Sequence, residues 1–169
     1  MNEIRLLFGR PAITDKSELI SAIRDLQLQY GCIIQALDAD KVVSTRHLLF
    51  ATEKALSAFS QKRNIAKDAG LEILRYASGE RQIEKAFGMG VSDRTERIAL
   101  ILARWGKECS WPDEGELARL LRPDELGCSC RYEAVKETFN ISSAEIEAVG
   151  EDRLEDLVIE RVALADTYR

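Results

Sequence analysis

Two arginine–amide pairs, Arg63-Asn64 and Arg81-Gln82, stand at the ends of the segment RNIAKDAGLEILRYASGERQI, residues 63–83. A guanidinium can hold a phosphate with two parallel hydrogen bonds or stack on a base. Asn and Gln amides can read the donor and acceptor edge of an exposed nucleotide, and single-stranded RNA ends are recognised by such combined contacts. The two pairs, hereafter the first and second corner, therefore indicate a site for one local anionic ligand.

The charge distribution agrees with a small site rather than a large one. The net charge is −5, which argues against a general nucleic-acid coat. Residues 60–90 nevertheless hold six lysines and arginines against four acidic residues, whereas the chain after Lys107 is strongly acidic. Lys85 lies near the second corner, and Tyr76 is placed where its ring could stack on a base.

Two alternatives to nucleotide recognition remain open for the corners. In a purely structural role, Arg63 and Arg81 pair with nearby acids, Asn64 caps a helix and Gln82 is solvated. In the rival functional class, the protein is a stand-alone small-molecule-binding protein or enzyme that holds an anionic metabolite at residues 63–82.

Catalytic and metal-binding motifs are missing from the sequence. It contains no GxxxxGK[ST], GxGxxG, GxSxG or HExxH, and its single histidine is His47. The pair Cys128 and Cys130 has no second pair at zinc-ligand spacing, and Cys32 lies in an apolar run. We therefore expect no catalytic residue, no metal and no cofactor, and a binding protein rather than an enzyme.

The apolar periodicity predicts an α+β fold in which about three strands form a small central sheet packed with about seven helices. The length fits a single domain over residues 1–169. Strands are expected over residues 3–9, 32–39 and 96–105. Helices are expected over residues 16–29, 44–59, 66–77, a short stretch after Gly79, 113–121, 131–138 and 151–166.

Local signals position the corners on these elements. Thr14 or Asp15 is expected to cap the first helix, which ends at Gly31, and Ser44 or Thr45 caps the second. A break at Gly79 separates the helix 66–77 from a short helix in which Ile83, Ala86 and Phe87 point inward. Each corner is thereby expected at a helix start.

The C-terminal helix carries more apolar surface than one packing face requires. Leu154, Leu157, Val158, Val162 and Ala165 form one face, and Ile159 and Ala163 widen it. Its charged residues argue against complete burial, so we expect a face shared with a partner. The helix over residues 44–59 is the alternative surface.

No apolar run approaches the length of a membrane span, and the N-terminal stretch MNEIRLLFGR lacks the features of a signal peptide. We expect the protein to work in the cytoplasm.

Several pieces of the sequence resemble one family in order along the chain. They are ALDA (36–39), the block 63–83, AFGMGV (86–91), ERIALILARW (96–105) and LEDLVIERVALADTYR (154–169). Together they resemble the PRPK-binding-protein (TPRKB) family, the small kinase-binding subunit of the KEOPS complex, and the compactness resembles its archaeal members.

The resemblance implies a non-catalytic partner of an atypical small kinase/ATPase. That kinase contacts the synthase subunit that places threonylcarbamoyl on the adenosine beside the tRNA anticodon. The family also implies binding of the single-stranded CCA end of tRNA, without a cofactor or a membrane. On this chain the implied tRNA-binding residues are Arg63, Asn64, Tyr76, Arg81, Gln82 and Lys85. The implied kinase interface is Leu154, Val158, Ile159, Val162 and Ala163.

Overall fold

The computed structural model describes residues 3–106 and 108–167, so Tyr168 and Arg169 of the closing motif lie outside the described residues. Two compact units divide the chain: Met1–Ala39 with Val91–Gly127, and Asp40–Gly90 with Cys128–Arg169. The α+β class is confirmed. Within the described residues, four strands and eight α-helices take the place of the expected three and seven.

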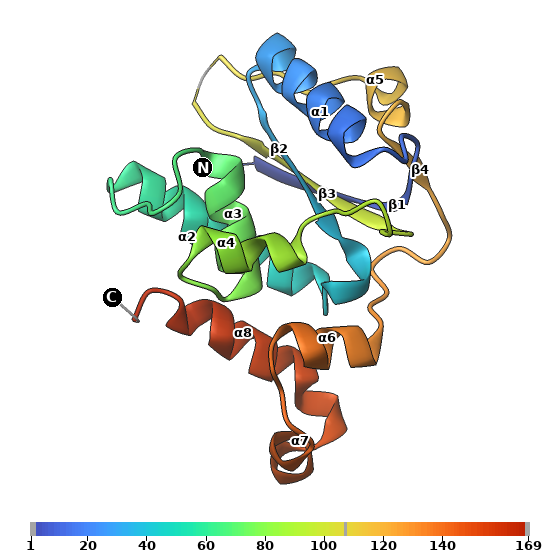
Figure 1. Cartoon of the computed structure of the whole chain (residues 1–169). Coiled ribbons are helices and arrows are strands. Elements are labelled where there is room, and N and C mark those ends of the chain that lie inside the picture. The colour runs from blue at the N-terminus through green and yellow to red at the C-terminus, as the bar shows by residue number, and fades with distance from the viewer. Residues whose placement is uncertain (1–2, 107, 168–169) are drawn as a thin grey trace. The chain divides into compact units, whose positions relative to one another are not determined.

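The first unit is built on an antiparallel sheet (Figure 1). Its elements are β1 (Glu3–Pro11), α1 (Lys16–Tyr30), β2 (Ile33–Asp38), β3 (Ile98–Arg104), α5 (Glu114–Ala118) and β4 (Leu121–Pro123). The strand order is β2-β3-β1-β4. The most apolar strand, β3, lies between β2 and β1 and is buried along nearly its whole length.

One face of this sheet is covered by α1. Leu19, Ile23 and Leu26 recur at helical spacing on α1 and are buried, together with Leu100 and Leu102 of β3. Burying side chains of this size stabilises a fold by about 1.5–3 kcal/mol each. This packing fixes α1 on the sheet.

The second unit is helical in the described residues. A 3₁₀ turn, Ala39–Lys41, leads into it from β2. It contains α2 (Thr45–Ser60), α3 (Ala69–Ser78), α4 (Ile83–Ala86), α6 (Tyr132–Thr138), α7 (Ser143–Val149) and α8 (Leu154–Leu164), with 3₁₀ turns at Phe87–Met89 and Glu151–Arg153. Helix α2 packs against both α3 and α8.

The expected helix ends are confirmed by their caps. Asp15 accepts a hydrogen bond from the Glu18 backbone N–H, and Ser44 accepts one from His47. Gly31 and Gly79 end α1 and α3 in the left-handed conformation, with φ values of 71° and 70°.

Four details differ from the expectation. The helix expected over 66–77 begins only at Ala69, because the Asp68 side chain accepts a hydrogen bond from Leu71 and caps it there. The helix expected over 113–121 ends at Ala118, and Leu121–Pro123 forms β4 by pairing with β1 instead. Helix α7 was not expected, although Ser142 and Glu145 form a capping box. Phe87 points outward, as described below.

Candidate functional site

The first corner lies in the loop between α2 and α3, not at a helix start. The half-buried Arg63 donates from Nε to the side-chain oxygen of Gln61 at 2.7 Å, and its Nη1 lies 4.0 Å from Asp166. Asn64 donates to the Ala66 carbonyl at 2.9 Å, so it is not the helix cap. The structural alternative therefore holds in part for Arg63 and fails for Asn64.

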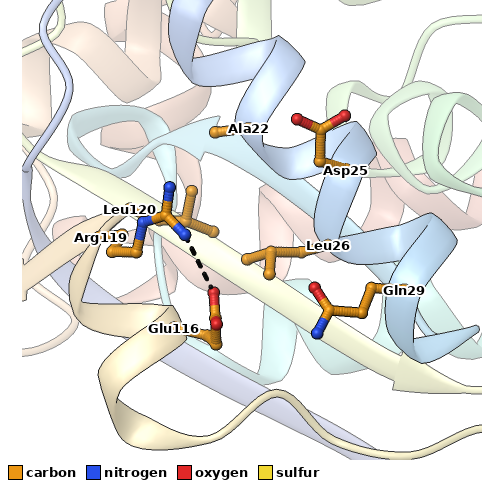
Figure 2. Close-up of a pocket in the computed structure, with 7 residues that line it drawn as sticks. All are labelled: Ala22, Asp25, Leu26, Gln29, Glu116, Arg119 and Leu120. Atoms are coloured by element: carbon orange, nitrogen blue, oxygen red, sulfur yellow. Dashed lines mark hydrogen bonds and ion pairs between the residues drawn. The ribbon is translucent and has the colours of Figure 1, made fainter.

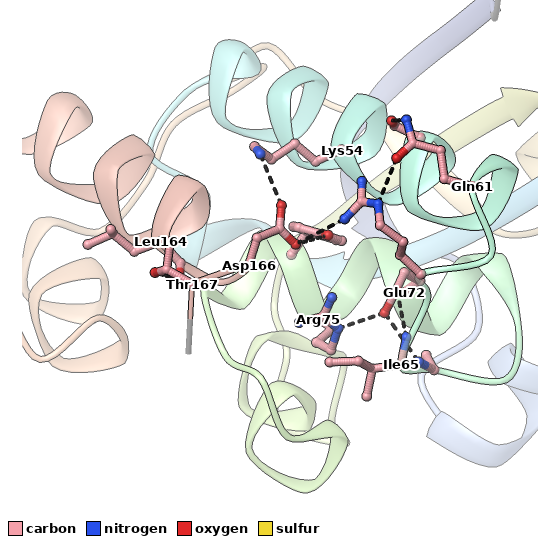
Figure 3. A network of polar contacts seen from close by, with 12 residues as sticks. Lys54, Gln61, Ile65, Glu72, Arg75, Leu164, Asp166 and Thr167 are labelled. Carbon is pink, nitrogen blue, oxygen red and sulfur yellow. Dashed lines mark hydrogen bonds and ion pairs between the residues drawn. The ribbon is translucent and has the colours of Figure 1, made fainter. Parts of the chain in front are cut away.

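A fully buried ion pair lies behind this loop. Glu72 and Arg75 on α3 are 0% and 1% exposed, and Nε of Arg75 lies 2.6 Å from the Glu72 carboxylate. The two Glu72 oxygens also accept the backbone N–H groups of Ile65 and Ala66 at 2.9 and 3.2 Å. Figure 3 shows that the Glu72 carboxylate interacts both with the loop at Ile65 and with Arg75.

The same guanidinium reaches the second corner. Nη1 of Arg75 donates to the carbonyl of Glu80 at 3.3 Å, immediately before Arg81. One buried arginine therefore links the loop that carries the first corner, through Glu72, to the turn that carries the second. The Glu72–Arg75 ion pair therefore contacts the backbone beside both corners.

A second polar cluster ties the chain after α8 to α2 and α3 (Figure 3). The Asp166 carboxylate accepts hydrogen bonds from Lys54 on α2, at 3.1 Å, and from the hydroxyl of Tyr76 on α3. Burial raises the pKa of Asp166, but the hydrogen bonds from Tyr76 and Lys54 outweigh this effect and lower it. Burial, reinforced by the neighbouring Asp166, raises the pKa of Tyr76.

Tyr76 is only 1% exposed, and the Arg75 guanidinium lies 4.5 Å from its ring centroid. Its ring is therefore not accessible for stacking on a base.

The second corner is exposed. Arg81, Gln82 and Lys85 are all solvent-accessible, and within the described residues no side chain pairs with any of them. Gln82 precedes α4 without making a side-chain cap. The salt-bridge alternative thus fails for Arg81.

Phe87 lies on the surface, although the sequence predicts that its ring points inward. It is 53% exposed, whereas Ala86 and Met89 on either side are fully buried. Phe87 begins a 3₁₀ turn, in which residues three apart share a face, so Ala86 and Met89 are buried together and Phe87 lies off their face. Phe87 and the second corner belong to one short exposed segment.

Helix α8 divides the residues expected at the partner interface into two groups. Leu154, Val158 and Val162 are at most 6% exposed and belong to the packing of this unit. Ile159 and Ala163 are half-buried and reach the surface. Only these two are available to a partner without unfolding the helix.

Ile159 and Ala163 follow Glu155 at four-residue spacing, so they share the side of α8 on which Glu155 pairs with α2. Arg46 of α2 pairs with Glu155 at 3.1 Å at one end of the contact between these two helices, and Lys54 pairs with Asp166 at the other end. Residues four apart share one side of a helix, so the half-buried Phe50 lies between Arg46 and Lys54. On α8, Ile159 and Ala163 occupy the corresponding positions between Glu155 and Asp166. We call Phe50, Ile159 and Ala163 the α2–α8 seam.

A small pocket in the first unit is a weaker candidate. It encloses about 100 Å³ between α1 and the segment that contains α5, and Asp25, Gln29 and Glu116 line it with Arg119 (Figure 2). Arg119 is already paired with Glu116 at 3.3 Å. A volume equal to roughly three or four waters is too small for a nucleotide.

In residues 3–106 and 108–167, no group of His, Cys, Asp and Glu could hold a metal ion. All four cysteines are free thiols. None of the helices in this part of the chain has the length and apolar character to cross a membrane.

Comparison with known protein families gives one match that covers most of the chain. A family profile described as kinase binding protein CGI-121 matches residues 12–166. The chain belongs to the CGI-121 family of kinase-binding proteins. This confirms the resemblance to the kinase-binding subunit of KEOPS. A search of curated proteins finds no match. In this CGI-121 protein the matched range contains both corners, Phe87 and the α2–α8 seam.

Proposed function

We propose that this CGI-121 protein is the non-catalytic subunit of a KEOPS-type complex of the archaeal kind, acting as one functional domain in the cytoplasm. It binds the atypical kinase/ATPase and the single-stranded CCA end of tRNA, and it meets the synthase subunit only through the kinase. The complex forms threonylcarbamoyl-adenosine beside the anticodon. The exposed, unpartnered second corner beside Phe87 is the observation that carries the tRNA-binding part.

The kinase surface is the α2–α8 seam. Phe50, Ile159 and Ala163 offer apolar area on two packed helices, and the ion pairs at its ends form a polar rim. Protein interfaces commonly combine an apolar centre with a polar rim. The buried residues Leu154, Val158 and Val162 support the seam from behind.

Replacing Ile159 by aspartate is expected to weaken kinase binding by about 2 kcal/mol or more, because the new charge must lose its water in the contact. The folded state should survive, since Ile159 is only half-buried. The measurement is co-purification from native lysate with bound proteins and RNA identified together, followed by titration with the purified kinase. Leu28→Asp is the matched control, because Leu28 is 80% exposed on α1. Unchanged kinase affinity in a folded Ile159→Asp protein would place the interface elsewhere.

The CCA site is formed by the second corner, Phe87 and the exposed edge of the first corner. Arg81 and Lys85 supply positive charge for phosphates, and Gln82 supplies an amide for a base edge. Phe87 replaces Tyr76 as the stacking residue, since it exposes its ring and Tyr76 does not. The buried Glu72–Arg75 pair holds both corners in place, so little order must be gained on binding.

Arg81→Ala and Phe87→Ala are each expected to weaken binding of intact tRNA by about 1–3 kcal/mol, the scale of a lost charged hydrogen bond or stacked base. Neither change should alter binding of tRNA that lacks its terminal CCA. Arg131→Ala is the matched control, because Arg131 is also exposed and its side chain has no partner in the described residues. Filter binding or fluorescence anisotropy with both RNAs gives the comparison. If the wild type binds the two RNAs equally, the CCA site is refuted while kinase binding by the family stands.

A further inference from the structure

The sheet of the first unit places two arginines opposite each other on neighbouring strands, and a third arginine directly precedes β3. Arg10 on β1 is paired directly with Arg122 on β4. On the other side of β1, the ladder with β3 ends where Gly9 lies opposite Ile98, and Arg97 directly precedes β3. Residues directly opposite in a sheet point to the same face. Arg10 and Arg122 therefore lie side by side on one face of the sheet.

Only one of the three arginines is neutralised. Arg97 is 6% exposed and donates two hydrogen bonds of 2.7 Å to the Asp124 carboxylate. It also donates a hydrogen bond to the Gly127 carbonyl. Arg10 and Arg122 are exposed, and neither side chain has a partner in the described residues. Glu96 and Glu125 lie near these arginines in sequence, but in the described residues neither forms an ion pair with Arg10 or Arg122. We call Arg10 and Arg122 the arginine rung.

Repulsion between the two arginines of the rung destabilises the folded sheet. Like charges placed directly opposite each other destabilise a sheet. Pro11 and Pro123 restrict the backbone beside the two arginines. The strands also approach closely, because a Cβ on Gly9 would lie 2.2 Å from the Arg122 carbonyl oxygen. The backbone positions of Arg10 and Arg122 are therefore fixed next to each other. An anion bound between the two guanidinium groups would relieve their repulsion.

We propose that the arginine rung binds a backbone phosphate of RNA, an inference that rests on the proposed tRNA binding. Each planar guanidinium offers a fork of N–H donors that matches the two free oxygens of a phosphodiester. A phosphate contact carries no sequence information. The rung therefore adds affinity without reading the CCA end.

The test compares Arg10→Ser and Arg122→Ser with the wild type on intact tRNA and on tRNA lacking CCA, over a range of salt concentrations. Each variant should bind both RNAs about tenfold more weakly at low salt, and the slope of log affinity against log salt should fall by about one. Removing one of two opposed like charges should leave the melting temperature unchanged or raise it. Arg24→Ser is the matched control, because Arg24 is an exposed arginine without a partner in the described part of the first unit.

The outcomes separate this inference from the CCA site. Rung variants that bind RNA like Arg24→Ser, with an unchanged salt slope, overturn the rung and leave the CCA site untouched. Equal wild-type binding of the two RNAs overturns the CCA site, whereas a loss in the rung variants still supports the rung. A rung loss confined to intact tRNA contradicts a phosphate contact that ignores sequence. If the wild type binds neither RNA at low salt, both proposals are wrong.

Discussion

Replacing Glu72 by alanine is expected to lower the free energy of unfolding by about 3–5 kcal/mol, the cost of breaking a buried ion pair by removing one partner. Glu72 is completely buried, and it neutralises Arg75 while accepting the N–H groups of Ile65 and Ala66. The alanine variant leaves the buried Arg75 charge without its carboxylate and two backbone N–H groups, of which that of Ala66 is buried, without their acceptor. Urea unfolding followed by circular dichroism measures the loss.

Glu72→Ala should also destabilise the loop around Ile65 and Ala66 more than it destabilises the rest of the protein. Amide hydrogen exchange at Ile65 and Ala66 should become faster in Glu72→Ala, because these two N–H groups lose their acceptor. Glu84→Ala removes an exposed carboxylate of the same kind from α4 and should change stability by no more than about 0.5 kcal/mol. A loss in Glu72→Ala no larger than in this control would show that the buried pair does not hold the corners.

Acidification from pH 7 to pH 5 is expected to cost about 2 kcal/mol of stability through His47 alone. Burial lowers the pKa of this histidine to about 4 from an ordinary value of 6.5, against smaller opposing effects of the Ala77 carbonyl and Glu155. Its Nε2 lies 2.7 Å from the Ala77 oxygen, and its Nδ1 accepts the Val43 N–H at 3.4 Å. Nδ1 is thus occupied as an acceptor and the ring stays neutral in the folded state.

The direction of the pH effect follows from proton binding. Between pH 6.5 and about 4 the unfolded chain binds a proton at His47 and the folded chain does not, so stability falls as the pH falls through this range. His47→Gln should flatten the dependence between pH 7 and 5, because glutamine keeps a donor and an acceptor and does not titrate. Denaturant unfolding at several pH values gives the slope, and the ring resonance in an NMR titration gives the pKa. A His47 midpoint near 6.5 in the folded protein contradicts this prediction.

The sequence alone determined the features that depend on neighbouring residues. Asp15, Ser44, Gly31 and Gly79 mark helix ends because capping and the left-handed conformation involve only a few adjacent residues. Three strands were predictable from apolar, partly β-branched runs. The short β4 was not, because three residues carry no periodicity and become a strand only by pairing with Gly9–Pro11. The motifs in order along the chain were sufficient for the family.

The tertiary structure decided which side chains are available to a ligand. Tyr76 is buried and its hydroxyl donates a hydrogen bond to Asp166, 90 residues later in the chain, while Phe87 is exposed. Arg75 is enclosed with Glu72, whereas the similar Arg81 is left without a partner. Whether a side chain is buried or paired depends on which distant segments of the chain pack together. A local sequence pattern does not contain that information. The arginine rung shows this most directly, because Arg10 and Arg122 become neighbours only through the register of two strands more than 100 residues apart.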